Sequence, residues 1–347
     1  MKPIILVLLL AATIVACGAP PPPPAPPAER RIDITTPVGD FQVYTRRVGD
    51  NPKIKVLLLH GGPSATSDYF EVLDKHFPGE GFEYYYYNQL GSYRTGTADN
   101  DSLFLTLPDS LQPNYDALWT TERFVEEVEQ VRIALGLDSS NFYLLGHSWG
   151  GILATEYALK YQQNLKGLVI SNMMASCPAY DKYAAEVLGP KLEPEVLAEI
   201  QALEAAEDYY NPRYTELVNG YYYTEHILRM PLDQWPDAVN RAFANMNYHV
   251  YKLMQGPSEF GISGRLETWD RSADLGKITV PTLVVGAEHD TMDPKYMEWM
   301  ATQFPQGRYL YCPNGSHMAM WDDEETYVNG LIRFIKDVDA GTFAAGN

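Results

Sequence analysis

The chain has 347 residues, and its 45 acidic against 26 basic side chains give a formal net charge of -19 at pH 7. This balance argues against nucleic acid as a partner, because binding a polyphosphate backbone needs a basic surface. Hydrophobic residues make up 46% of the chain and charged residues 20%, which is typical of a globular protein rather than a disordered one. No self-similar period of roughly 20 to 50 residues is visible, which argues against solenoids and propellers.

The first residues predict a targeting segment. An apolar run over residues 4–15 follows a positive start and is too short to span about 30 Å of hydrocarbon as a helix. The stretch Ile14-Val15-Ala16-Cys17 resembles the lipobox of bacterial lipoproteins, in which the cysteine is lipidated and becomes the new N-terminus. We therefore expect residues 1–17 to be a lipoprotein signal peptide, with an ordinary secretory signal as the alternative. By the same resemblance, Gly18 favours the outer membrane of a bacterial cell envelope, with the domain in the periplasm or at the surface.

A proline-rich stretch over residues 18–30 follows. Proline fixes φ and lacks an N–H donor, so this stretch favours extended polyproline II structure and is interpreted as a tether to the membrane. Beyond it the chain contains Cys177 and Cys312, which could pair in an oxidising compartment, although the sequence leaves that open.

Short β-rich runs then alternate with amphipathic segments. Strands are expected at 32–36, 41–46, 55–60, 82–88, 142–146, 168–171, 282–285 and 308–311, the first two as a hairpin. Helices are expected around 124–135 with a C-cap at Gly136, and at 149–161, 294–304 and 324–338. Nearly continuous hydrophobic strands separated by helices predict an α/β fold with a mostly parallel, doubly wound sheet.

The stretch 177–265 breaks this alternation. It is long, helical in pattern and rich in tyrosine, so we expect a helical cap inserted into a core formed by residues 31–176 and 266–340.

A nucleophile motif lies where the predicted strand 142–146 passes into the predicted helix 149–161. Gly146-His147-Ser148-Trp149-Gly150 matches G-x-S-x-G, in which a tight strand-to-helix turn exposes the serine at the end of a sheet. Ser148 is therefore the predicted nucleophile. We expect His147, as a strand residue, to point away from the Ser148 hydroxyl.

An earlier glycine pair predicts the oxyanion hole. His60-Gly61-Gly62-Pro63 follows the strand 55–60, and glycines there let backbone N–H groups approach a developing oxyanion. We expect Gly61 and Gly62, with the N–H of Trp149, to form this hole.

The base and the acid of a triad follow in the chain order Ser, Asp, His that this fold class uses. Among the seven histidines, His317 lies in a late loop after the last predicted strand and is the predicted base. Asp290 follows the strand 282–285 and is the predicted acid, with Asp293 and Glu288 as lesser candidates. Metal-ligand spacings and a dinucleotide motif are both missing from the sequence, so we expect no metal and no cofactor.

Together these motifs resemble the proline iminopeptidase (prolyl aminopeptidase) type of α/β-hydrolase serine peptidase. That group includes the tricorn-interacting aminopeptidase and the L-amino-acid amidases. The resemblance covers about residues 33–338 and rests on the motifs above, on Asn88-Gln89-Leu90-Gly91-Ser92 and on Gly256-Pro257-Ser258-Glu259-Phe260. It implies a serine aminopeptidase that releases an N-terminal residue, proline or another, from short peptides or amino-acid amides. Glu259 matches a family glutamate that binds the substrate α-amino group.

Four positions depart from the family pattern, one of them Tyr93, which stands where the family has a glycine. Thr291 stands where the family has a second amine-binding glutamate, Ser64 where it has a glycine, and Asn88 where it has an aspartate. The missing carboxylate at Thr291 keeps an alternative open, an L-amino-acid amidase or a small-substrate esterase. A binding protein that kept the fold without catalysis is disfavoured by the complete set of triad residues in the sequence.

Overall fold

The structure is a computed structural model and describes residues 28–346. The predicted signal peptide with Cys17 lies outside the described residues, as does most of the predicted tether; the first strand already begins at Ala28. Within residues 28–346, no helix is both long and apolar enough to cross a membrane.

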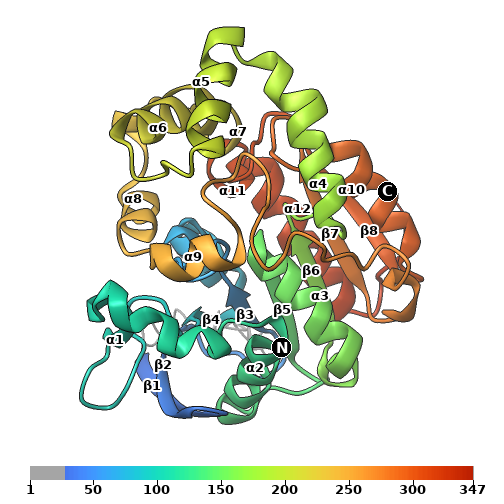
Figure 1. Cartoon of the computed structure of the whole chain (residues 1–347). Helices are drawn as coiled ribbons and strands as arrows, with labels where there is room; N and C mark the ends of the chain where they lie inside the picture. The colour runs from blue at the N-terminus through green and yellow to red at the C-terminus, as the bar shows by residue number, and fades with distance from the viewer. Residues whose placement is uncertain (1–27, 347) are drawn as a thin grey trace, which may run out of the picture.

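One eight-stranded sheet organises the described chain, in the order β1-β2-β4-β3-β5-β6-β7-β8 (Figure 1). The strands are β1 Ala28–Thr36, β2 Gly39–Val48, β3 Lys55–Leu59, β4 Glu83–Asn88, β5 Phe142–His147, β6 Gly167–Ser171, β7 Thr282–Ala287 and β8 Gly307–Cys312. β2 pairs antiparallel with both β1 and β4, and the strands from β4 to β8 run parallel. The predicted α/β fold with a leading hairpin and a mostly parallel sheet is confirmed.

The inner strands from β4 to β7 are buried on both faces, whereas the edge strand β8 is only partly buried. Residues of the inner strands alternate between two hydrophobic clusters. Leu57 and Leu59 of β3 belong to one cluster, whereas Val56 and Leu58 belong to the other. The first cluster also includes residues of α2 Thr121–Leu135, α3 Trp149–Tyr161 and α10 Pro294–Gln303. The second cluster includes residues of α12 Glu324–Asp339 and of the 3-10 segment η1 Ser67–Lys75. Helices therefore cover both faces of the sheet, as a doubly wound fold requires.

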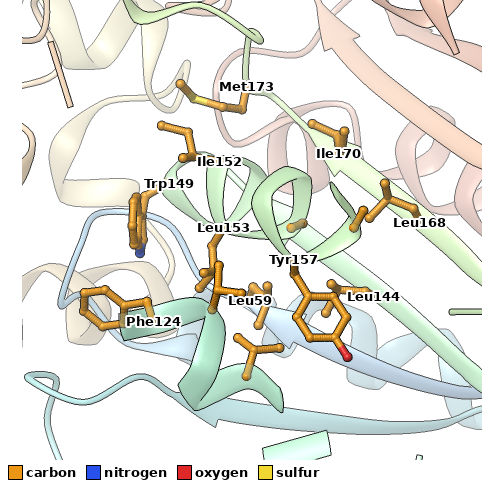
Figure 2. Packing of buried hydrophobic residues seen from close by; sticks show 14 of the residues in the cluster. Leu59, Phe124, Leu144, Trp149, Ile152, Leu153, Tyr157, Leu168, Ile170 and Met173 are labelled. Atoms are coloured by element: carbon orange, nitrogen blue, oxygen red, sulfur yellow. The ribbon is translucent and has the colours of Figure 1, made fainter. Parts of the chain in front are cut away.

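Helix α3 is the central element of the first cluster. Figure 2 shows its residues Trp149, Ile152, Leu153 and Tyr157 packed among side chains from the strands and from α2. The preceding helix α2 ends at Gly136, which has φ 64, as the sequence predicted for a C-cap. This packing fixes the start of α3, where the predicted nucleophile lies.

The segment between β6 and β7 contains a group of short helices. They are α4 Cys177–Tyr183, α5 Pro194–Ala205, α6 Pro212–Leu217, α7 Thr224–His226, α8 Asp237–Ala244 and α9 Tyr248–Met254. In Figure 1, α5, α6, α8 and α9 gather to one side of the sheet. We call residues 177–265 the cap. Two shorter helices lie outside it, α1 Leu103–Thr106 and α11 Ala319–Asp322.

The two cysteines of the described chain do not form a disulfide. Cys177 begins α4, Cys312 ends β8, and both are buried free thiols. Burial raises the pKa of each thiol, so both stay protonated at neutral pH.

Candidate active site

Ser148 occupies a strained turn between β5 and α3. Its backbone has φ 57 and ψ -129, a conformation that side-chain-bearing residues rarely adopt. A Cβ at Gly146 would lie 2.0 Å from the Gly150 carbonyl oxygen, and a Cβ at Gly150 would lie 2.1 Å from the carbonyl oxygen of Leu59. Both motif glycines are therefore required sterically, because β3, β5 and α3 meet here without room for a side chain.

Parallel pairing brings the ends of several strands to the same edge of the sheet. Leu59 of β3 pairs with Gly146 of β5, His147 pairs with Ser171 of β6, and Ser171 pairs with Val285 of β7. The loops that leave these strands consequently start close together, although they are far apart in sequence.

His317 and Asp290 form a buried pair at this edge. His317 Nδ1 lies 2.8 Å from Asp290 Oδ1, and the two side chains are 4% and 0% exposed. Asn172 Nδ2 donates to the other carboxylate oxygen, Asp290 Oδ2, at 2.7 Å. Burial lowers the pKa of His317, but the charge and hydrogen bond of Asp290, helped by Glu259 and Asp322, outweigh it, so the net direction is upward.

Thr291 belongs to the same network. Its Oγ1 lies 3.2 Å from His317 Nδ1 and donates to Asp290 Oδ1 at 3.3 Å. Sequence reasoning treated Thr291 only as a missing carboxylate and did not anticipate Asn172. The one available signal for Asn172 was an asparagine directly after a buried strand, where a left-handed residue (φ 54) turns the chain.

The two lesser acid candidates lie in other contacts. Asp293 accepts from the Lys295 N–H at 2.9 Å and caps α10, and Glu288 accepts from the Tyr311 hydroxyl at 2.5 Å. Asp290 is thus the acid of this loop that reaches His317.

The glycine loop after β3 lies against the nucleophile, but Gly61 differs from its predicted role. The Gly61 N–H already donates to the Tyr69 hydroxyl at 2.5 Å, so it is not free to bind an oxyanion. A Cβ at Gly61 would lie 2.6 Å from Ser148 Cβ, which explains the glycine by close approach to the serine. Gly62 follows with φ 48, and Trp149 is the first residue of α3, where backbone N–H groups lack helical partners.

A cavity of about 480 Å³ joins these groups. Ser148, His317, Gly61, Gly62 and Glu259 all line it. The rest of the lining includes six tyrosines of the cap: Tyr209, Tyr210, Tyr214, Tyr223, Tyr248 and Tyr251. The cavity therefore combines core residues with a cap wall that is rich in tyrosine.

Glu259 is the acidic side chain of this cavity. It is 9% exposed; its Oε1 accepts from the Tyr251 hydroxyl at 2.6 Å, and Oε2 lies 3.4 Å from the Tyr180 hydroxyl. The ion pairs found within residues 28–346 include none to Glu259. A carboxylate held by neutral hydroxyls at a cavity wall can accept a cationic group from a ligand.

Ser64 and Asn88, which differ from the family pattern, each make hydrogen bonds that hold the loops around the site. Ser64 adopts φ 73 and donates its hydroxyl to the Asn247 carbonyl oxygen at 2.7 Å, which ties the glycine loop to the cap. Asn88 Oδ1 accepts from the Ser67 N–H and hydroxyl, at 2.9 and 2.7 Å. The aspartate that the family has at position 88 could accept the same two hydrogen bonds from Ser67.

Comparisons with known proteins agree with this geometry. Residues 55–324 match the family model described as alpha/beta hydrolase fold. The chain is 57% identical over 308 residues to the proline iminopeptidase of Flavobacterium johnsoniae, covering 89% of this chain and 98% of that protein. It is also 57% identical over 314 residues to the proline iminopeptidase of Elizabethkingia meningoseptica, covering 90% and 99% of the two chains.

Solved structures show the same similarity at lower identity. The crystal structure of VinJ aligns with a TM-score of 0.78 and 27% identity, over 90% of this chain and 100% of that one. The crystal structure of a proline iminopeptidase from Mycobacterium smegmatis aligns with a TM-score of 0.73 and 26% identity, over 90% and 99% of the two chains.

Proposed function

The chain belongs to the proline iminopeptidase family of α/β-hydrolase-fold enzymes, and on this premise we propose that it is a serine aminopeptidase that releases N-terminal proline from peptides. The observation that carries the proposal is Glu259, a buried carboxylate in the same cavity as Ser148. A carboxylate there binds the free α-amino group of a peptide. Holding the N-terminus beside the nucleophile restricts cleavage to the first peptide bond.

Proline suits this anchor chemically. Its secondary ammonium offers two N–H donors, whereas a primary ammonium offers three. Glu259 has two oxygens that can each accept more than one hydrogen bond, and Tyr251 already uses part of that capacity. With threonine at position 291, the anchor has a single carboxylate, which is enough to neutralise one ammonium charge.

The reaction follows from the arrangement of Ser148, His317 and Asp290. His317 Nδ1 is engaged by Asp290, which leaves Nε2 to take the Ser148 proton as Oγ attacks the carbonyl carbon of the first residue. The N–H groups of Gly62 and Trp149 stabilise the oxyanion. His317 then protonates the departing amine, and a water activated by the same nitrogen hydrolyses the acyl-enzyme.

The test is hydrolysis of proline, alanine and phenylalanine 4-nitroanilides by the full chain in detergent, each substrate with and without an N-acetyl block. The proposal expects cleavage of free-amine substrates, proline best, and none in Ser148→Ala, a variant that keeps the wild-type thermal midpoint. Equal cleavage of blocked substrates would instead favour the amidase or esterase alternative. Unchanged turnover in Ser148→Ala would contradict a serine mechanism.

We propose separately that Cys17 carries a lipid anchor in a bacterial cell envelope. This proposal is supported by the lipobox-like Ile14-Val15-Ala16-Cys17 and the proline-rich stretch after it. Expression with a clickable fatty acid should label the wild-type chain and place it in the membrane fraction. Labelling that persists in Cys17→Ala would contradict the anchor.

A further inference from the structure

A chain of hydrogen bonds connects the glycine loop to the loop that carries His317. Its first link is Tyr69, in η1, a residue that sequence reasoning did not single out. The Tyr69 hydroxyl accepts from the Gly61 N–H at 2.5 Å and lies 3.0 Å from His147 Nδ1. Tyr69 is 2% exposed and His147 is 1% exposed, and both lie at the wall of the cavity that holds Ser148. Hydrogen bonds between groups this buried are stronger than the same bonds in water.

The second link is His147, the residue before the nucleophile. Its Nε2 lies 2.7 Å from the carbonyl oxygen of His317. A carbonyl oxygen only accepts, so Nε2 carries the proton, and Nδ1 accepts from the Tyr69 hydroxyl. Burial, followed by the nearby charge of His317, lowers the pKa of His147 to about 3. The ring is therefore neutral at working pH and held in one tautomer.

Both backbone polar groups of His317, the predicted base, are hydrogen-bonded. His317 accepts from His147 through its carbonyl oxygen, and its N–H donates to the His226 carbonyl oxygen of the cap at 2.9 Å. Its ring is fixed by Asp290. His147, the last residue of β5 and the neighbour of Ser148, thus holds the base from the core.

We propose that Tyr69 and His147 are positioning residues that set the oxyanion loop and the base loop relative to Ser148. This inference rests on the proposed peptidase function. Neither side chain reacts with substrate; each acts through a backbone group of the machinery, Gly61 in one case and His317 in the other. As predicted, His147 does not direct its bonds at the Ser148 hydroxyl, but it is more than a packing residue.

The decisive variant is Tyr69→Phe. It keeps the ring and removes the hydroxyl that bonds to both the Gly61 N–H and His147 Nδ1. Loss of alignment should lower kcat/KM for proline 4-nitroanilide by roughly tenfold to a hundredfold. The effect should be smaller for proline 4-nitrophenyl ester, corrected for spontaneous hydrolysis. Nitrophenolate leaves without a proton, whereas the anilide nitrogen must receive one from His317.

Tyr86→Phe is the matched control. The Tyr86 hydroxyl is also buried and also bonds to η1, donating to Asp74 at 2.6 Å, but it contacts no residue of the site. It should keep the wild-type ratio of anilide to ester kcat/KM, whereas Tyr69→Phe should lower that ratio several-fold. An unchanged ratio in Tyr69→Phe would overturn the link from Tyr69 to the base loop. Unchanged rates on both substrates would overturn its link to the oxyanion loop as well.

A second pair of variants tests His147 directly. His147→Gln keeps an N–H₂ donor that can reach the His317 carbonyl oxygen, and His147→Phe keeps only the bulk. The proposal expects the glutamine variant to retain the anilide-to-ester ratio better than phenylalanine does, and equal ratios in the two variants would contradict it. These results are distinguishable from failure of the proposed function, in which the wild-type chain would not cleave free-amine proline substrates at all.

Discussion

The sheet edge and the cap contribute to the same cavity, but they are built differently. At the edge, Ser148 and its glycines fit with no spare space, and Asp290 is fully buried with a hydrogen bond to each carboxylate oxygen. In the cap, short helices and the loops between them present tyrosines, and the loop after α9 presents one carboxylate, Glu259, whose partners are neutral hydroxyls. The edge is suited to fixed chemistry and the cap to binding a charged, variable ligand.

The largest expected effect is at the edge. Asp290→Asn leaves the shape of the site but cannot hold His317 with Nδ1 protonated, so kcat should fall by about 10⁴-fold. Steady-state hydrolysis of proline 4-nitroanilide measures this fall in kcat. A loss below tenfold would mean that another group orients His317.

The corresponding change in the cap should affect binding more than chemistry. Glu259→Gln removes the charge that neutralises the substrate ammonium, which should cost about 2–5 kcal/mol in kcat/KM for free-amine substrates. Rates on N-acetylated substrates should not fall with it. An equal loss on both kinds of substrate would show that Glu259 supports the fold rather than the amine.

The pH profile of Glu259→Gln sharpens the same contrast. Burial lowers the pKa of His317, whereas Asp290 and then Glu259 raise it, for a net upward direction. His317 must be neutral to act as a base, so activity is lost as pH falls through this pKa. Removing the Glu259 charge lowers the pKa, and the acid limb of kcat/KM should move to lower pH. A shift to higher pH would contradict this coupling.

A steric test of the edge is Gly61→Ala. The added Cβ would lie 2.6 Å from Ser148 Cβ, so the loop must move away from the nucleophile. Overpacking of this kind typically costs about 1–3 kcal/mol of stability, which thermal unfolding measures. Gly136→Ala is a useful contrast, since a Cβ there meets nothing within 4 Å and only the left-handed φ of 64 is strained. Full activity in Gly61→Ala would show that the close approach is not needed.

The smallest effect is expected at Thr291. Thr291→Val removes one weak hydrogen bond from the Asp290–His317 pair, and a single bond of this kind contributes about 0.5–1.5 kcal/mol. Activity should therefore fall severalfold at most, while Thr291→Ser, which keeps the hydroxyl, should stay near wild type. Gain of activity in Thr291→Val would argue against a role in the triad.

Much of the fold could be predicted because local patterns and burial agree. Short apolar runs such as 142–146, alternating with longer amphipathic segments, favour buried strands of a parallel sheet, and the strained turn at Ser148 has a sequence signature of its own. The order Ser148, Asp290, His317 also follows from the fold class. The spacing of the glycines predicts an oxyanion role for Gly61. Its N–H already donates to the Tyr69 hydroxyl, and spacing alone cannot reveal that contact.

By itself the sequence predicted the strands, the strand-to-helix turn at Ser148 and the family, since these depend on hydrophobic periodicity and on short motifs that follow one another in a fixed order along the chain. Only the tertiary structure decided which groups share hydrogen bonds. Asn172, Thr291, Tyr69 and His147 reach the site from separate elements, and the Gly61–Tyr69–His147–His317 chain spans more than one loop. Such contacts depend on how strand ends align in the sheet, and no local pattern of residues encodes that alignment.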